Sequence, residues 1–140
     1  MTDYAQLLKT SGLKSTFQRM NILENIETYG HMSIDEIYAK ISIVHPSLSL
    51  ATVYKNIILM LDNDVLTEVC VLGKKSKYEL KKEEHIHFVC TVCEHVEDRP
   101  HDLSIDGIFE NISKRDNFLL SVQQINLYGV CSSCQMKVAS

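Results

Sequence analysis

Four cysteines stand in two identical pairs, Cys90-Thr-Val-Cys93 and Cys131-Ser-Ser-Cys134. The turn of a CxxC pair points both sulfurs to one side, which is the arrangement of a zinc knuckle. Two such pairs can supply four thiolates to one tetrahedral ion, and a shell closed by four protein ligands leaves no position for a substrate. The spacing therefore predicts a structural Zn²⁺ site. The alternative is a framework of disulfides, permanent or reversible.

Two histidines directly before the first pair indicate a second site. Alternate residues of a strand share a face, so His85 and His87 point together while Cys90 has the opposite parity. Imidazole and carboxylate ligands together suit Fe²⁺, Mn²⁺, Ni²⁺ or Zn²⁺. The carboxylates on neighbouring predicted strands are Glu79, Glu97 and Asp98. Spacing alone does not choose between Glu97 and Asp98, and two exposed strand histidines without an ion are the alternative.

The other histidines and the fifth cysteine are weaker candidates. His31 follows Gly30 in a loop between two predicted helices, from where it could reach a site near the middle of the chain. His45, His95 and His101 are more typical of surface or loop residues. Cys70 lies in a β-rich stretch and is predicted to be a small buried hydrophobe rather than a ligand.

The first half must position these residues with helices and a hairpin. Ser33 and Glu36 form a capping box, and Thr16 and Ser49 are further candidate caps. The predicted helices span 3–11, 16–30, 33–44 and 49–62, and the β-rich stretches 65–72 and 77–80 flank a basic tip. In the last helix we expect Leu50, Val53, Ile57, Met60 and Leu61 to share an apolar stripe. Helices followed by a hairpin are typical of a winged helix, with 49–62 as recognition helix.

The second half begins after a polar seam at 81–84. Strands are predicted at 86–90 and 96–99, with Pro100 ending the second. A helical stripe follows (Leu103, Ile105, Ile108, Phe109 and Ile112), and then a long alternating strand over 118–128. So short a unit buries little core, and metal and dimerisation would both stabilise it. The predicted fold class is α+β: a DNA-binding winged helix at 1–80, the polar seam at 81–84, and a small α/β unit at 85–140.

Composition limits the class of protein. The chain of 140 residues is 45% hydrophobic and 23% charged, as expected for a globular domain or two. No apolar run approaches a membrane span and no secretory signal is visible, so we expect a cytoplasmic protein without a membrane partner. The net charge of −4 argues mildly against nucleic acid as a partner, although a basic cluster can still lie on one face of the first half.

Taken in order, these motifs resemble the ferric uptake regulator family of metal-dependent transcriptional regulators. The resemblance runs from Leu13 to Cys134, and its landmarks are Thr16–Arg19, Ser49–Asn56, His85–Cys93 and Leu127–Cys134. It implies that Cys90, Cys93, Cys131 and Cys134 hold structural zinc. It also implies a regulatory Fe²⁺ or Mn²⁺ site made of His31, Glu79, His85, His87 and Asp98. Asp98 rather than Glu97 is included because the family ligand lies five residues after the second knuckle cysteine.

The resemblance further implies a homodimeric repressor of palindromic operator DNA, in which 81–84 is a hinge and 85–140 is the dimerisation domain. At position 98 the aspartate resembles the peroxide-sensing branch, whereas at position 79 the glutamate resembles the iron-sensing branch. In the peroxide-sensing branch the resemblance implies that peroxide oxidises His31 or His85. We favour the peroxide sensor and keep the iron-responsive repressor as the alternative. The candidate DNA contacts are Thr52, Tyr54, Lys55 and Asn56 for the recognition helix, Arg19 for phosphate, and Lys74 and Lys75 for the wing. Tyr54 stands at the margin of the apolar stripe, so a core position is its alternative.

Two other functional classes are compatible with some of these residues. An open site of histidine and carboxylate can activate water, as in zinc hydrolases. The sequence offers no convincing general base beyond the proposed ligands, so we do not expect an enzyme. A thiol switch, in which the CxxC pairs release zinc and form disulfides on oxidation, is a further alternative that is compatible with DNA binding.

Overall fold

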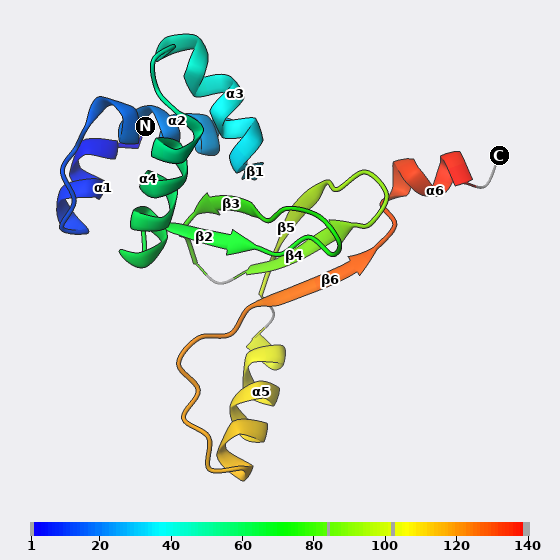
Figure 1. Cartoon of the computed structure of the whole chain (residues 1–140). Coiled ribbons are helices and arrows are strands. Elements are labelled where there is room, and N and C mark those ends of the chain that lie inside the picture. The colour runs from blue at the N-terminus through cyan, green and yellow to red at the C-terminus, as the bar shows by residue number, and fades with distance from the viewer. Residues whose placement is uncertain (1, 84, 102, 139–140) are drawn as a thin grey trace. The chain divides into compact units, whose positions relative to one another are not determined.

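The computed structural model describes residues 2–83, 85–101 and 103–138 (Figure 1). The chain divides into two compact units, and the boundary lies between Lys82 and Glu83. Glu84 of the predicted seam and the side chain of Leu103 lie outside the described residues. The first unit holds α1 (Tyr4–Thr10), α2 (Phe17–Tyr29), β1 (Met32–Ser33), α3 (Ile34–Val44), α4 (Leu50–Asp62), β2 (Leu66–Val69) and β3 (Lys77–Leu80). The second holds β4 (His85–Cys90), β5 (Val96–Pro100), α5 (Leu103–Arg115), β6 (Ile125–Gly129) and α6 (Ser132–Val138).

Side-chain caps begin all four helices of the first unit. Thr16 accepts a hydrogen bond from the amide of Arg19, and Ser49 accepts one from the amide of Thr52. Ser33 and Glu36 form the reciprocal capping box that the sequence predicts. Each such cap contributes about 1 kcal/mol to helix stability. The predicted starts of α2, α3 and α4 are therefore confirmed.

The core of the first unit is made by the apolar faces of its helices and one face of its sheet. Its fully buried members are Leu8, Ile22, Leu23, Ile26, Ile37, Ile41, Val53, Ile57 and Met60. Leu50 was expected in the apolar stripe of α4 but is 44% exposed. Leu50 is the first residue of the helix, and the buried part of the stripe begins one turn later at Val53.

A three-stranded antiparallel sheet completes this unit, in the order β1-β3-β2. The hairpin β2–β3 was predicted, whereas β1 is only two residues long and too short for an alternation to be recognised. Met32 of β1 lies opposite Tyr78 of β3. Cys70 is exposed, which corrects the expectation of a buried residue, because β2 ends at Val69 and the chain leaves the sheet there.

The sheet of the second unit has the order β5-β4-β6, with β5 antiparallel and β6 parallel to the central β4. The prediction of a strand over 118–128 is wrong for the residues before Ile125, where β6 begins. Leu119 is 90% exposed, so the alternating apolar residues before Ile125 do not form a buried sheet face in the described part of the chain. The apolar stripe of α5 is also open to solvent at Ile108, Phe109 and Ile112.

Among the described residues, none of the helices has the length and apolar character needed to cross a membrane.

Candidate metal centres and DNA-contact residues

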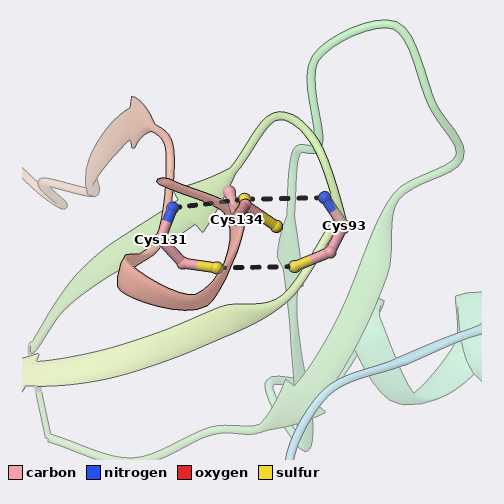
Figure 2. A group of neighbouring side chains, drawn as sticks. Cys93, Cys131 and Cys134 are labelled. Carbon is pink, nitrogen blue, oxygen red and sulfur yellow. Dashed lines mark hydrogen bonds between the residues drawn. The ribbon is translucent and has the colours of Figure 1, made fainter. Parts of the chain in front are cut away.

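The four predicted zinc ligands come together in the second unit, and Figure 2 labels three of them, Cys93, Cys131 and Cys134. Cys90 ends β4 and lies opposite Gly129 of β6, so the two knuckles leave the same end of neighbouring parallel strands. The four sulfurs lie within 4.8 Å of one another, and the Sγ atoms of Cys93 and Cys131 are 3.8 Å apart. A tetrahedron of sulfurs at the Zn–S bond length has edges of about 3.8 Å. The residues therefore fit a Cys₄ zinc site.

Backbone amides prepare one of these thiols for an ion. The N–H groups of Cys93 and Cys131 lie 3.5 and 3.4 Å from Sγ of Cys90. These two hydrogen bonds lower the pKa of Cys90 to about 6. Hydrogen bonding with Cys131, followed by burial, raises the pKa of Cys134 to about 12. Cys90 is therefore a thiolate at neutral pH, whereas Cys134 must release a proton when it binds zinc.

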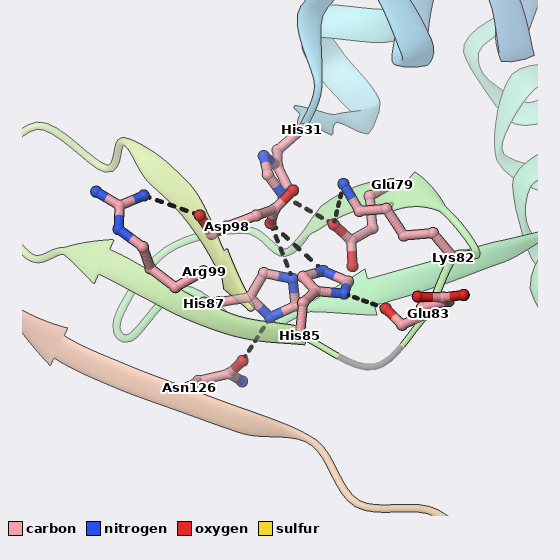
Figure 3. Close-up of polar contacts among 9 residues, drawn as sticks. All are labelled: His31, Glu79, Lys82, Glu83, His85, His87, Asp98, Arg99 and Asn126. Atoms are coloured by element: carbon pink, nitrogen blue, oxygen red, sulfur yellow. Dashed lines mark hydrogen bonds and ion pairs between the residues drawn. The ribbon is translucent and has the colours of Figure 1, made fainter. Parts of the chain in front are cut away.

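A first pair of possible ligands for another ion lies within the first unit (Figure 3). Nε2 of His31 is 2.8 Å from Oε2 of Glu79, and Glu79 is only 1% exposed. His31 directly precedes β1, and the pairing of β1 with β3 brings it beside Glu79 on β3. Nζ of Lys82 lies 4.0 Å from the same oxygen. The pair joins one imidazole to one buried carboxylate.

A second set of possible ligands lies within the second unit (Figure 3). His87 of β4 is opposite Asp98 of β5, and the rings of His85 and His87 meet edge to face with centroids 4.4 Å apart. Nε2 of His85 is 3.4 Å and Nε2 of His87 is 3.6 Å from Oδ1 of Asp98. Two imidazole nitrogens thus converge on one carboxylate. This combination of nitrogen and oxygen donors suits Fe²⁺ and Mn²⁺.

The sheet register separates the two carboxylates that spacing left open. Glu97 is opposite Phe88, on the other face from His87 and Asp98. It is bound by Nη2 of Arg99 at 2.6 Å, and this hydrogen bond together with the charge of Arg99 lowers the pKa of Glu97. Asp98 is therefore the residue beside both histidines.

Each histidine of this set also has a partner at its other ring nitrogen. Nδ1 of His85 is 2.7 Å from the carbonyl oxygen of Glu83, and Nδ1 of His87 is 2.9 Å from Oδ1 of Asn126 on β6. The sequence analysis does not predict a role for Asn126. Its place beside His87 depends on the pairing of β6 with β4, and no sequence pattern reveals that pairing.

The weaker histidine candidates lie apart from these sets. The ring of His45 packs edge to face on Phe17. His95 pairs with Glu97, and Nδ1 of His101 lies 2.7 Å from Asp106. None of the three is grouped with other metal ligands among the described residues.

The predicted DNA contacts lie on α2, α4 and the loop between β2 and β3. Thr52 and Lys55 are exposed on α4, and Tyr54 is 51% exposed, which excludes a core position for it. Asn56 accepts a hydrogen bond from Arg19 of α2. Lys74 is exposed in the loop, and Lys75 pairs with Asp35.

Comparison with known proteins agrees with these motifs. Residues 10–128 match the family model of the ferric uptake regulator family. The peroxide operon regulator of Bacillus subtilis is 28% identical over 138 residues, which covers 98% of this chain and 94% of the relative.

Solved structures agree in fold as well. The Campylobacter jejuni peroxide stress regulator is 36% identical with a TM-score of 0.76, over 95% of this chain and 100% of that one. The Vibrio cholerae ferric uptake regulator, whose DNA-binding domains are described as rearranged, is 33% identical with a TM-score of 0.76, over 92% and 100%. The chain therefore belongs to the ferric uptake regulator family of metal-responsive transcriptional regulators, and not to a class of enzymes.

Proposed function

We propose that this protein is a cytoplasmic repressor that binds palindromic operator DNA as a homodimer, and that its DNA affinity is set by Fe²⁺ or Mn²⁺. The ion would be held by a ligand set drawn from both units: His31, Glu79, His85, His87 and Asp98. The observation that carries the proposal is that each unit presents a group of histidine and carboxylate side chains that could serve as metal ligands. Glu79 lies just before the connection between the units, and His85 lies just after it.

The chemistry of the two partial sets supports a shared ion. The pair in the first unit offers two donors and the group in the second offers three, whereas Fe²⁺ and Mn²⁺ favour about six ligands. Two carboxylates in the combined set would balance the charge of a divalent ion. Ligands from both units would hold them at one mutual angle, so metal binding would select that arrangement from the ensemble. Binding of the ion would in this way change how the DNA-binding unit is oriented.

The exposed face of α4 supports the DNA contact. Thr52, Tyr54 and Lys55 project from it into solvent, and the side chain of Asn56 lies beside them. A recognition helix of this kind enters the major groove, and a two-fold dimer places two of them on the halves of a palindrome. The angle between the units would then decide whether both helices fit one operator.

Exposed apolar residues support the homodimer. In α5 they are Ile108, Phe109 and Ile112, and in the segment that follows they are Phe118, Leu119 and Val122. A monomer seldom leaves so many large apolar side chains close together in solvent. A second copy of the same surface would bury them by a two-fold contact.

The similarity to peroxide regulators and the types of the proposed ligands support a response to peroxide. Bound Fe²⁺ would supply the chemistry that activates hydrogen peroxide. One oxygen atom of the peroxide would replace a hydrogen on a ligand ring, and the other oxygen would leave with that hydrogen as water. His31 and His85 are the rings proposed to receive it. An oxidised ring donates less well, so the two sets of ligands separate and the protein leaves the operator. With Mn²⁺ the rings stay unmodified.

A DNA-binding titration tests this proposal. Operator affinity is measured without added metal and with Fe²⁺, Mn²⁺ or Zn²⁺, each with and without hydrogen peroxide. Peptide masses are recorded for the same samples. We expect metal to strengthen binding, and peroxide to abolish it only with Fe²⁺, with the mass of one oxygen atom gained at His31 or His85. Full binding without metal would exclude the regulatory site. Unmodified histidines, with binding that follows Fe²⁺ alone, would favour the iron-responsive repressor.

The thiol switch differs in its readout. Oxidation at the CxxC pairs would release zinc together with operator DNA. Zinc retained after peroxide treatment that has already released the DNA excludes this alternative.

A further inference from the structure

The ring of His87 is held from both sides within the second unit (Figure 3). Its Nδ1 lies 2.9 Å from Oδ1 of Asn126, and its Nε2 lies 3.6 Å from Asp98. The ring is 2% exposed, so water has little access to either nitrogen. A neutral imidazole carries one proton, and the partner of one nitrogen decides which of the two remains a donor to a metal.

We propose that Asn126 is a positioning residue for the regulatory ion. Its amide oxygen accepts the proton of Nδ1, which leaves the lone pair of Nε2 on His87 directed toward Asp98. This inference rests on the proposed regulatory site, which it deepens by naming the group that sets the ligand's tautomer. The amide itself does not touch the ion.

Strand pairing fixes the relationship between the two residues. β4 and β6 are parallel neighbours, and His87 lies directly opposite Asn126 in their register. Directly opposed side chains share a face of the sheet and stand close together. The contact is therefore built into the centre of the sheet rather than made by a loop.

A second contact orients the amide of Asn126. Its Nδ2 lies 3.5 Å from the hydroxyl of Tyr128, two residues along β6 and on the same face. With the amide nitrogen directed to that hydroxyl, the amide oxygen faces the imidazole. The reverse orientation would direct an N–H to Nδ1 and place the ring proton on Nε2, where it would block the metal.

The amide also limits how strongly the ion is held. Histidine ligands commonly donate their second N–H to a carboxylate or a carbonyl oxygen, and a carboxylate makes the ring a stronger donor. Asn126 orients His87 without adding a negative charge to the two carboxylates already proposed as ligands. His85 has a neutral partner as well, the carbonyl oxygen of Glu83. Neutral partners at both rings suit an ion that must exchange when its concentration changes.

Two substitutions at one position separate orientation from charge. Asn126→Leu keeps the size of the side chain and removes the acceptor, and Asn126→Asp keeps the acceptor and adds a charge. Loss of such an outer partner lowers metal affinity by about 10- to 100-fold. We expect that loss for Mn²⁺ in Asn126→Leu and a gain in Asn126→Asp. Asn111→Leu, at an exposed position of α5, is the matched control and should leave Mn²⁺ affinity unchanged.

The experiment uses the full chain with zinc retained. Mn²⁺ affinity is measured by calorimetry, zinc content by elemental analysis, and the ring tautomer of His87 by ¹⁵N NMR of the protein without Mn²⁺. A proton on Nδ1 in the wild type, with zinc content equal in all variants, is the expected result. A proton on Nε2 would overturn the inference, and so would unchanged Mn²⁺ affinity in Asn126→Leu.

The two proposals fail in different ways. If Asn126→Leu does not fold, the wild-type tautomer and the Asn126→Asp affinity still decide the role of Asn126. If the wild type binds Mn²⁺ with the expected tautomer but operator affinity ignores the metal, the proposed function fails and the positioning role stands. If operator affinity follows the metal but His87 carries its proton on Nε2, the positioning role alone fails.

Discussion

Arg19 of α2 donates a hydrogen bond from Nε to Oδ1 of Asn56 on α4, at a distance of 3.0 Å. The same guanidinium donates from Nη1 to the carbonyl oxygen of Lys14 at 3.0 Å, and Nδ2 of Asn56 donates to the carbonyl oxygen of Thr52 at 3.1 Å. These contacts fix the orientation of the Asn56 amide at the edge of the exposed face of α4. Arg19 was predicted as a phosphate contact, and in this arrangement it also organises the helix proposed to read DNA.

Arg19→Ala should lower operator affinity by loosening Asn56. One hydrogen bond contributes about 1 kcal/mol, so we expect a loss of about fivefold. The loss should be greatest on the native operator and smaller on operators substituted at the base that Asn56 faces. Affinities for a panel of single-base operator variants, each at several salt concentrations, measure this. If Arg19→Ala weakens all operators equally and lowers the salt slope, Arg19 acts on phosphate alone.

Lys55→Ala should weaken binding to every operator and reduce the dependence on salt. Lys55 is exposed on α4, and a lysine that neutralises one phosphate contributes about one unit to the slope of log affinity against log salt. The measurement is operator affinity from low to physiological salt. Lys114→Ala on α5 removes an equal charge from the second unit and serves as the control. An unchanged slope in Lys55→Ala would show that this lysine does not contact phosphate.

Local chemistry explains which parts of the fold the sequence predicts. The Ser33–Glu36 capping box and the Ser49 cap depend on residues three apart, so the starts of α3 and α4 are visible in the sequence. The CxxC pairs are visible for the same reason. Pairing between distant segments is not: β1 was missed, and the strand predicted from Phe118 begins only at Ile125.

The candidate site divides in the same way. Alternation along β4 places His85 and His87 on one face, as the sequence indicates. The choice of Asp98 over Glu97 needs the register of β4 with β5, or a resemblance to a family. Asn126 needs the register of β4 with β6 and has no local signal. Residue types therefore predict the ligands, and sheet topology supplies the groups that orient them.

His31→Ala should remove the metal dependence of DNA binding. The substitution deletes the imidazole that lies 2.8 Å from Glu79, so the first unit keeps only one donor for the proposed ion. Operator affinity with saturating Mn²⁺ should fall to that of the metal-free protein, while zinc content stays constant. His95→Ala, which removes an exposed histidine of the second unit, is the control. A His31→Ala protein with unchanged metal dependence would contradict a ligand set shared by the two units.

Phe109→Glu should dissociate the dimer. Phe109 lies in the exposed apolar stripe of α5, and a carboxylate there would have to be buried without a partner in a dimer that covers the stripe. Sedimentation at micromolar concentrations should show a shift from dimer to monomer, accompanied by loss of operator affinity. Glu110→Gln alters the next position by one charge and should stay dimeric. A Phe109→Glu protein that remains dimeric would place the contact elsewhere.

Zinc affinity should rise with pH, and the slope of log affinity against pH should change near the pKa of Cys90. Cys134 has a raised pKa and is protonated at neutral pH, so zinc must displace its proton. The pKa of Cys90 is lowered to about 6, so this residue adds no proton to the exchange above that pH and one more below it. Competition with a chelator between pH 5 and about 8 measures the affinity, and calorimetry in buffers of different ionisation enthalpy counts the protons. We expect one additional proton per zinc below about pH 6. A constant proton count through this range would show that the amides of Cys93 and Cys131 do not hold Cys90 as a thiolate.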